Sequence, residues 1–270
     1  MSLPLYIVNA FTSTTFGGNP AAVMPLEHWL SDETLLAIAA QHNLSETAFF
    51  VHTSAGHYEL RWFTPGAEVQ LCGHATLASA HVLKAHLGFQ GDEVIFSTRF
   101  SGKLCARYIG EGIELDFPSL RPQPHSPEPA LLAALKTPVV AAAIPEIHPW
   151  KALYEVESET ALREIVPDFP AIAAAVDHAV IVTARGERHD FVSRFFAPNL
   201  RVNEDPVTGS AHCVLTPYWA EKLGSDSLSA AQVSERGGEL SCVLAGDRVK
   251  LTGQSVTYAV ADVVGAIGLD

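Results

Sequence analysis

The chain has 270 residues, of which 48% are hydrophobic and 17% charged, a composition typical of a compact globular protein that excludes a disordered one. A formal net charge of −13 argues against a nucleic-acid backbone as partner, because phosphate contacts need clustered lysines and arginines. No apolar run approaches the roughly 18 residues that span a bilayer, and we expect no secretory leader. Four widely spaced cysteines are too few for a disulfide framework. We therefore expect a cytoplasmic protein that acts on small molecules.

The first half is predicted to mix strands with two helices. A β-rich opening followed by FGGNPAAV at 16–23 predicts a hairpin. Ser31 is expected to cap a helix that ends near His42, and Glu46 follows at the junction with the next strand. A second helix, rich in small residues, is predicted from His74 to His86, with Gly88 after its end. Strands are predicted at 48–51, 57–63, 93–100, 103–108 and 112–117.

A proline-rich segment divides the chain. Five prolines occur within the twelve residues 118–129, so this segment cannot be regular structure throughout. We expect an N-terminal α/β domain at 1–117, a linker at 118–129 and a C-terminal α/β domain at 130–270, although the last strand could pack on the first domain. In the second half, strands are predicted at 139–144, 179–183, 190–196, 238–244, 248–253 and 255–263, with helices at 159–165 and 210–223.

The stretch 61–83 recurs in altered form at 194–215. Each copy has an apolar strand, a proline turn, an irregular acidic segment and a small-residue turn that opens onto a helix. The first arginine lies twelve residues before the glycine in one copy and fifteen in the other, which indicates a three-residue insertion in the acidic turn. The repeat favours a tandem of α/β units with mixed sheets over a doubly wound parallel sheet. It also predicts one site between the two halves.

The two small-residue turns are candidate anion-binding sites. A strand followed by a glycine turn and a helix leaves backbone N–H groups unpaired, and the helix dipole favours a negative charge there. Gly73 with His74, and Gly209 with Ser210, would supply such N–H groups to a carboxylate. A glycine before a helix is a weak signal alone, but two in matching contexts support each other.

Three ionisable residues lie where such a site would be. Glu46 could shuttle a proton, although a single glutamate is more often a solvated surface residue. The dipole at the start of its helix is expected to favour neutral His74, which could also be a structural histidine. Asp205 belongs to an EDP tripeptide that is commonly just a turn. The repeat favours the functional interpretation of all three, and Glu68 and Glu204 lie nearby in the sequence.

The cysteines allow two further interpretations. Cys72 with His74, and Cys213 with His212, could be metal ligands, but no paired spacing supports zinc, so we predict no metal. Cys72 is a better candidate as a nucleophile, because a thiol at a helix N-terminus has a lowered pKa. The second copy has Thr208 in the corresponding place, so a pair of thiol bases lacks one member.

Four motifs carry a resemblance to a known family: FGGNPAAV, NLSETAFF, LCGHATLASAHVL and EDPVTGSAHC, in this order and at this spacing. Together they resemble the PhzF family of phenazine-biosynthesis-like proteins. The resemblance implies an α+β fold of the diaminopimelate-epimerase-like kind, with two pseudo-symmetric domains that each wrap a mixed sheet around a central helix. It also implies an active site in the cleft between the domains, and a homodimer.

The resemblance implies an isomerase that acts on trans-2,3-dihydro-3-hydroxyanthranilate without any cofactor. Glu46 matches the glutamate that moves a proton between ring carbons. His74 and Asp205 would hold polar groups of the substrate, and its carboxylate would bind to the residues of the two turns, namely Gly73, Gly209 and Ser210. Two alternatives remain open: an epimerase or racemase that uses Cys72 with a non-thiol second base, and a non-catalytic binding protein on the same scaffold.

Overall fold

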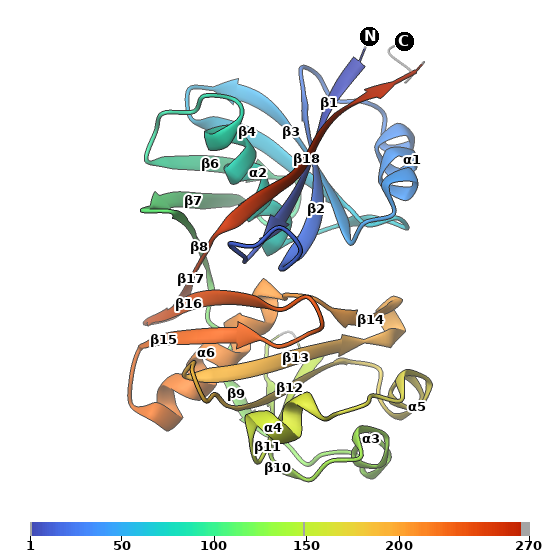
Figure 1. The fold of residues 1–270 in the computed structure, drawn as a ribbon, viewed down its shortest axis with the longest axis vertical. Coiled ribbons are helices and arrows are strands. Elements are labelled where there is room, and N and C mark those ends of the chain that lie inside the picture. The colour runs from blue at the N-terminus through green and yellow to red at the C-terminus, as the bar shows by residue number, and fades with distance from the viewer. Residues whose placement is uncertain (1, 148, 266–270) are drawn as a thin grey trace. The chain divides into compact units, whose positions relative to one another are not determined.

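The computed structural model describes residues 2–147 and 149–265. The chain forms two compact units, one made of 1–116 with 252–270 and the other of 117–251 (Figure 1). Each unit combines a mixed sheet with few helices, which confirms the predicted α+β class. Within the described residues, no helix has the length and apolar character needed to cross a membrane.

The first unit is one mixed sheet with a helix inside its curve. Strand β1 pairs with both β18 and β2, and the sheet continues through β3, β4, β6, β7 and β8. The β2–β3 and β4–β6 pairs are parallel, and the others are antiparallel. The strands are β1 (Ser2–Ala10), β2 (Asn19–Leu26), β3 (Glu46–Ser54), β4 (His57–Phe63), β5 (Glu68–Val69), β6 (Glu93–Thr98), β7 (Lys103–Ile109), β8 (Gly112–Pro118) and β18 (Ser255–Val264).

Helix α2 (Gly73–Ala85) lies inside this sheet and contacts strands along most of it (Figure 1). Residues 74–80 are all buried, so the helix has no polar face, as expected for a helix enclosed by a sheet. Its hydroxyl groups are satisfied internally, because Thr76 donates to the carbonyl of Cys72 at 2.6 Å and Ser79 to that of Ala75 at 2.7 Å.

Helix α1 (Asp32–His42) covers another part of the first sheet. The Ser31 hydroxyl accepts a hydrogen bond from the Thr34 N–H at 3.2 Å, which confirms the predicted cap. Asn43 ends the helix in the left-handed conformation, with φ of 52°. The apolar side of α1 buries Leu35 and Ile38 in one cluster with core residues of β2 and β3.

The second unit repeats this plan with more helices. Its sheet runs from β9 through β10, β11, β12, β13 and β15 to β16, with β14 on β13, and the β11–β12 and β13–β15 pairs are parallel. The strands are β9 (Pro122–Pro124), β10 (Val139–Pro145), β11 (Lys151–Val156), β12 (Ala179–Arg185), β13 (Phe191–Ala197), β14 (Val202–Asp205), β15 (Ser227–Gln232), β16 (Gly238–Ala245) and β17 (Arg248–Gly253). The helices are α3 (Pro129–Leu135), α4 (Glu159–Arg163), α5 (Phe169–Ala175), α6 (Gly209–Leu223) and the short η1 (Pro198–Leu200).

The repeat seen in the sequence extends to strand register. In each copy, the phenylalanine two residues after the arginine pairs with a glutamate: Phe63 lies opposite Glu68, and Phe196 lies opposite Glu204. Both arginines hold these glutamates bidentately: Arg61 to Glu68 at 2.7 and 2.8 Å, and Arg194 to Glu204 at 2.8 and 2.9 Å. The segments expected to be irregular instead form β5 and β14, because strand pairing and these ion pairs hold them. The three extra residues fall in the turn that contains η1.

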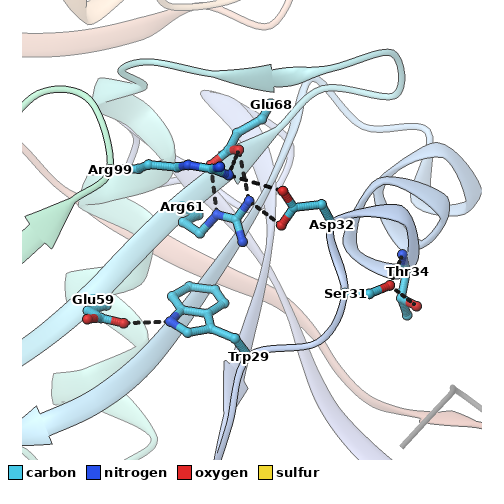
Figure 2. A network of polar contacts seen from close by, with 8 residues as sticks. All are labelled: Trp29, Ser31, Asp32, Thr34, Glu59, Arg61, Glu68 and Arg99. Carbon is cyan, nitrogen blue, oxygen red and sulfur yellow. Dashed lines mark hydrogen bonds and ion pairs between the residues drawn. The ribbon is translucent and has the colours of Figure 1, made fainter. Parts of the chain in front are cut away.

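In the first unit the arginine belongs to a larger ion-pair network (Figure 2). Arg61 also bonds Asp32 at 2.8 Å, and Arg99 reaches both Asp32 and Glu68 at 3.1 and 3.0 Å. The network ties the first turn of α1 to β4 and β5.

The proline-rich segment belongs to the second unit. We expected a linker at 118–129, but Pro122–Pro124 form β9 on the edge of β10, and Pro129 begins α3. Both positions suit proline, since a strand edge and a first helical residue need no backbone N–H. The last strand, β18, pairs with β1 in the first unit. No local pattern in the sequence marks α3, α5, β11 and β15, because they are short and lack clear periodicity.

Candidate active site

A buried carboxylate and imidazole face each other in the first unit. Glu46 is the first residue of β3, and His74 is the second residue of α2. The Glu46 Oε2 and His74 Nε2 atoms lie 3.2 Å apart, and their side chains are only 18% and 7% exposed. The structure therefore brings together two of the three ionisable residues singled out in the sequence.

The other nitrogen of the His74 ring faces two further side chains. The Cys72 Sγ and Asn19 Nδ2 atoms each lie 3.4 Å from His74 Nδ1. Asn19 is fully buried at the start of β2, a role that the sequence analysis missed although it noted the motif. Gly18 makes this placement possible. It has φ of +68°, and a Cβ there would stand 2.3 Å from the Ala10 carbonyl oxygen.

His74 favours its protonated form. Burial alone lowers the pKa of His74, but the neighbouring Cys72 and Glu46 outweigh burial and hold this pKa well above its ordinary value. The expectation of a neutral ring is therefore wrong, because the neighbouring Cys72 and Glu46 favour the charged form of His74. A protonated ring is a hydrogen-bond donor at both nitrogens.

Cys72 is a poor nucleophile at neutral pH. Burial raises the pKa of the Cys72 thiol, and the negative charge of Glu46 raises it further. The expectation of a lowered pKa at the helix N-terminus is therefore wrong. The thiol is 7% exposed, and the cost of burying its charged form outweighs the lowering of its pKa by His74 and by the Ala75 N–H of α2.

The same three residues offer ligand atoms within 4.8 Å of one another. Their arrangement does not suit one shared metal ion. Glu46 faces Nε2 of His74, whereas Cys72 faces Nδ1, and one ion can bind only one nitrogen of a ring. The geometry instead fits two separate contacts to one imidazole.

The start of α6 in the second unit has its own polar cluster. Thr208 Oγ1 donates to Asp205 Oδ2 at 2.5 Å. Gln232, which is 1% exposed at the end of β15, accepts from the Thr208 N–H at 2.9 Å and donates to the Asp205 carbonyl at 2.7 Å. The sequence analysis missed Gln232 because it did not identify β15.

The two glycine turns have the same local structure. Thr208 is the N-cap of α6 and Cys72 that of α2, both with extended backbone and neither with a side-chain capping bond. The first-turn N–H groups of both helices thus lack the usual side-chain acceptor. Thr208, Gly209 and Ser210 of one unit correspond to Cys72, Gly73 and His74 of the other.

Strand register shows which residues of the second unit correspond to Glu46 and His74. Thr47 lies opposite Phe63 and Val180 opposite Phe196, so Glu46 corresponds to Ala179. Glu46, Cys72 and His74 are therefore matched by Ala179, Thr208 and Ser210. The first unit carries a proton acceptor, and the second unit carries none at the equivalent positions.

The fold is shared with a solved epimerase. A hydroxyproline epimerase from Agrobacterium vitis matches with a TM-score of 0.52 over 97% of this chain and 92% of its own, at 12% identity. This likeness concerns the fold alone. The repeated α+β units place the chain in the class of diaminopimelate-epimerase-like proteins.

The family is shown by closer relatives. The model of the PhzC-PhzF family, the phenazine biosynthesis-like proteins, matches residues 8–261, and the chain belongs to that family. Two proteins of Pseudomonas aeruginosa, each named an uncharacterized isomerase, are 47% and 49% identical to it, with 96% of this chain and 97% of theirs covered. The crystal structure of a PhzF family protein from Enterococcus faecalis has a TM-score of 0.94 at 43% identity, covering 98% of this chain and 100% of that one. The chain is therefore an isomerase of this family.

Proposed function

We propose that the protein is a cofactor-independent isomerase in which Glu46 removes a proton from one carbon of a small carboxylate-bearing substrate and returns it to another. Substrate and product then have the same atoms, and no oxidant or reductant is consumed. The observation that carries this proposal is the 3.2 Å contact between Glu46 and His74 in the first unit. The equivalent positions of the second unit hold Ala179 and Ser210, which cannot make such a contact. One proton carrier suits a proton shift better than the paired bases of a racemase.

His74 supports this chemistry in two ways. Its ring lies against Glu46 and limits the positions that the carboxylate can adopt. Its protonated form also carries a positive charge that would attract a polar group of the substrate. Asp205 is the second group that we assign to the polar substituents of the substrate.

The carboxylate of the substrate would bind to backbone N–H groups at the two glycine turns, through Gly73, Gly209 and Ser210. The absence of a side-chain cap at Cys72 and at Thr208 supports this assignment. Resemblance to the family favours trans-2,3-dihydro-3-hydroxyanthranilate as the substrate.

The test is to incubate the purified protein with trans-2,3-dihydro-3-hydroxyanthranilate in deuterated water and follow substrate loss and deuterium incorporation by NMR. Glu46→Gln should still bind but lose about 10²- to 10⁴-fold in turnover. Glu59→Gln is the matched control, because Glu59 lies in the same unit and accepts from Trp29 instead. Full turnover by Glu46→Gln would contradict the role of Glu46. Binding without turnover by the wild type would contradict this substrate.

An epimerase that uses Cys72 with a non-thiol second base is the alternative. The contact of 3.4 Å between Cys72 Sγ and His74 supports it, because a protonated imidazole would stabilise a thiolate beside it. The raised pKa of Cys72 and its replacement by Thr208 in the second unit favour the glutamate mechanism.

We further propose a cytoplasmic homodimer. The homodimer follows from the family resemblance, and the four free cysteines fit a reducing compartment. Light scattering of the purified protein would test the dimer by its mass.

A further inference from the structure

A lysine is buried beside the start of α6. Lys151, the first residue of β11, is only 1% exposed. Its Nζ donates to the Ser210 carbonyl at 3.0 Å and lies 4.0 Å from the centre of the Trp150 ring. An ammonium group has three N–H donors, and burial of its charge is costly unless it is compensated. The ring face compensates part of this cost.

The position of Lys151 mirrors that of Glu46. Lys151 pairs with Ala179 in the second unit, and Ala21 pairs with Glu46 in the first, both between parallel strands. Since Ala179 corresponds to Glu46, Lys151 corresponds to Ala21. At this paired position each unit thus has one charged residue, negative in the first and positive in the second. Both contact the second residue of the buried helix, His74 and Ser210 respectively.

Two positive features therefore meet at one turn. The N-terminus of α6 carries the positive end of the helix dipole, and the Lys151 ammonium adds a full charge next to it. Like charges repel each other, so this arrangement is unfavourable until an anion binds at the turn. Burial lowers the pKa of Lys151 to about 8, as expected for an ammonium with little compensation.

We propose that Lys151 is a positioning residue for the anion-binding turn at Gly209 and Ser210: it holds the first turn of α6 through the Ser210 carbonyl and adds positive potential behind the N–H groups that receive the substrate carboxylate. This inference rests on the proposed carboxylate site. It does not depend on which reaction follows. Lys151 itself is too buried to touch the substrate, so it acts through the turn.

Cys213 is the titratable group of α6 that faces Lys151. Burial raises the pKa of Cys213 to about 11, although Lys151 and Arg248 both lower it. Cys213 therefore remains a thiol between pH 6.5 and 9.5. The pKa of His74 is also raised above its ordinary value, so a change in anion affinity near pH 8 is assigned to Lys151 only if Lys151→Met abolishes it.

The test uses sodium benzoate as the anionic probe, with calorimetry from pH 6.5 to 9.5 and amide NMR at pH 7. In the wild type, benzoate should shift the Gly209 and Ser210 amide signals, and its Kd should rise as the pH passes through about 8. Lys151→Met should weaken binding at pH 7 at least about 10-fold and abolish this pH dependence. Lys151→Arg should restore most of the affinity.

Lys222→Met is the matched control, because it removes the same charge at the other end of α6, where Lys222 pairs with Glu155. It should leave benzoate affinity unchanged. Equal affinity in a folded Lys151→Met variant, or unshifted Gly209 and Ser210 signals in the wild type, would overturn the inference. If Lys151→Met fails to fold, a flat pH profile of the wild type overturns it equally. If the protein binds benzoate as expected but shows no turnover in the isomerase assay, only the proposed reaction is contradicted.

Discussion

Gln232 holds Thr208 by hydrogen bonds to both its main chain and its side chain. The Gln232 Oε1 accepts from the Thr208 N–H at 2.9 Å, and Nε2 lies 3.2 Å from Thr208 Oγ1. The same Nε2 donates to the Asp205 carbonyl. One amide from β15 therefore satisfies the backbone on both sides of the turn that leads into α6.

Replacement of Gln232 by leucine should destabilise the protein by about 2–4 kcal/mol, because it removes the hydrogen bonds that Gln232 makes to the buried Thr208 N–H and to the Asp205 carbonyl. Urea unfolding would measure this change. Gln90→Leu is the control, since Gln90 is exposed and should change stability little. Equal stability of the two variants would show that water replaces the Gln232 amide.

The two arginines of the repeat should differ in their contribution to stability. Arg194 donates to Glu204 and to the Leu162 and Ile165 carbonyls. Arg194→Met therefore leaves the largely buried Glu204 carboxylate without its arginine and removes a donor from the Leu162 and Ile165 carbonyls, so it should cost about 3–5 kcal/mol.

Arg61→Met should cost less, about 1–3 kcal/mol, because Arg99 also contacts Glu68 and can still compensate its charge (Figure 2). Chemical denaturation of both variants tests this order. A larger loss for Arg61→Met would mean that the half-exposed Arg99 contributes nothing to the network.

Cys72 should be slow to react with thiol reagents. It is buried and its pKa is raised, whereas Cys105 is partly exposed. In a time course with iodoacetamide at pH 7, mass spectrometry should find Cys105 alkylated well before Cys72. Cys72→Ala should keep turnover if Glu46 is the proton carrier. Fast alkylation of Cys72, together with loss of turnover in a folded Cys72→Ala variant, would favour the epimerase alternative.

Lys151 should make stability depend on pH in a defined window. Its pKa is about 8 in the folded protein and about 10.5 in the unfolded chain, so between these values the unfolded state binds more protons and wild-type stability gains from rising pH. Lys151→Met removes the cost of burying the charge. The variant should exceed the wild type in unfolding free energy at pH 7, and this advantage should shrink by up to about 3 kcal/mol by pH 10.5. Urea unfolding at both pH values tests this, and a constant difference would contradict it.

Much of the fold and part of the candidate site follow from local sequence patterns. The Ser31 cap, the hairpin at 16–23 and the ends of the two buried helices depend on neighbouring residues, so the sequence was sufficient to predict them. The repeat was also visible in the sequence, because both copies keep the arginine, the glycine and the helix pattern in the same order. These features identified Glu46 and His74 as candidates.

Tertiary structure decided what these residues face and which protonation states they favour. Strand register joins residues far apart in the chain, and only register shows that Ala179 replaces Glu46 in the second unit. The pKa shifts of Cys72 and His74 went against local expectation: burial raises the pKa of the Cys72 thiol, and the charges of Cys72 and Glu46 raise the pKa of His74 in spite of burial. Gln232 and Lys151 act through contacts with residues 24 and 59 positions away, and no local pattern marks such partners.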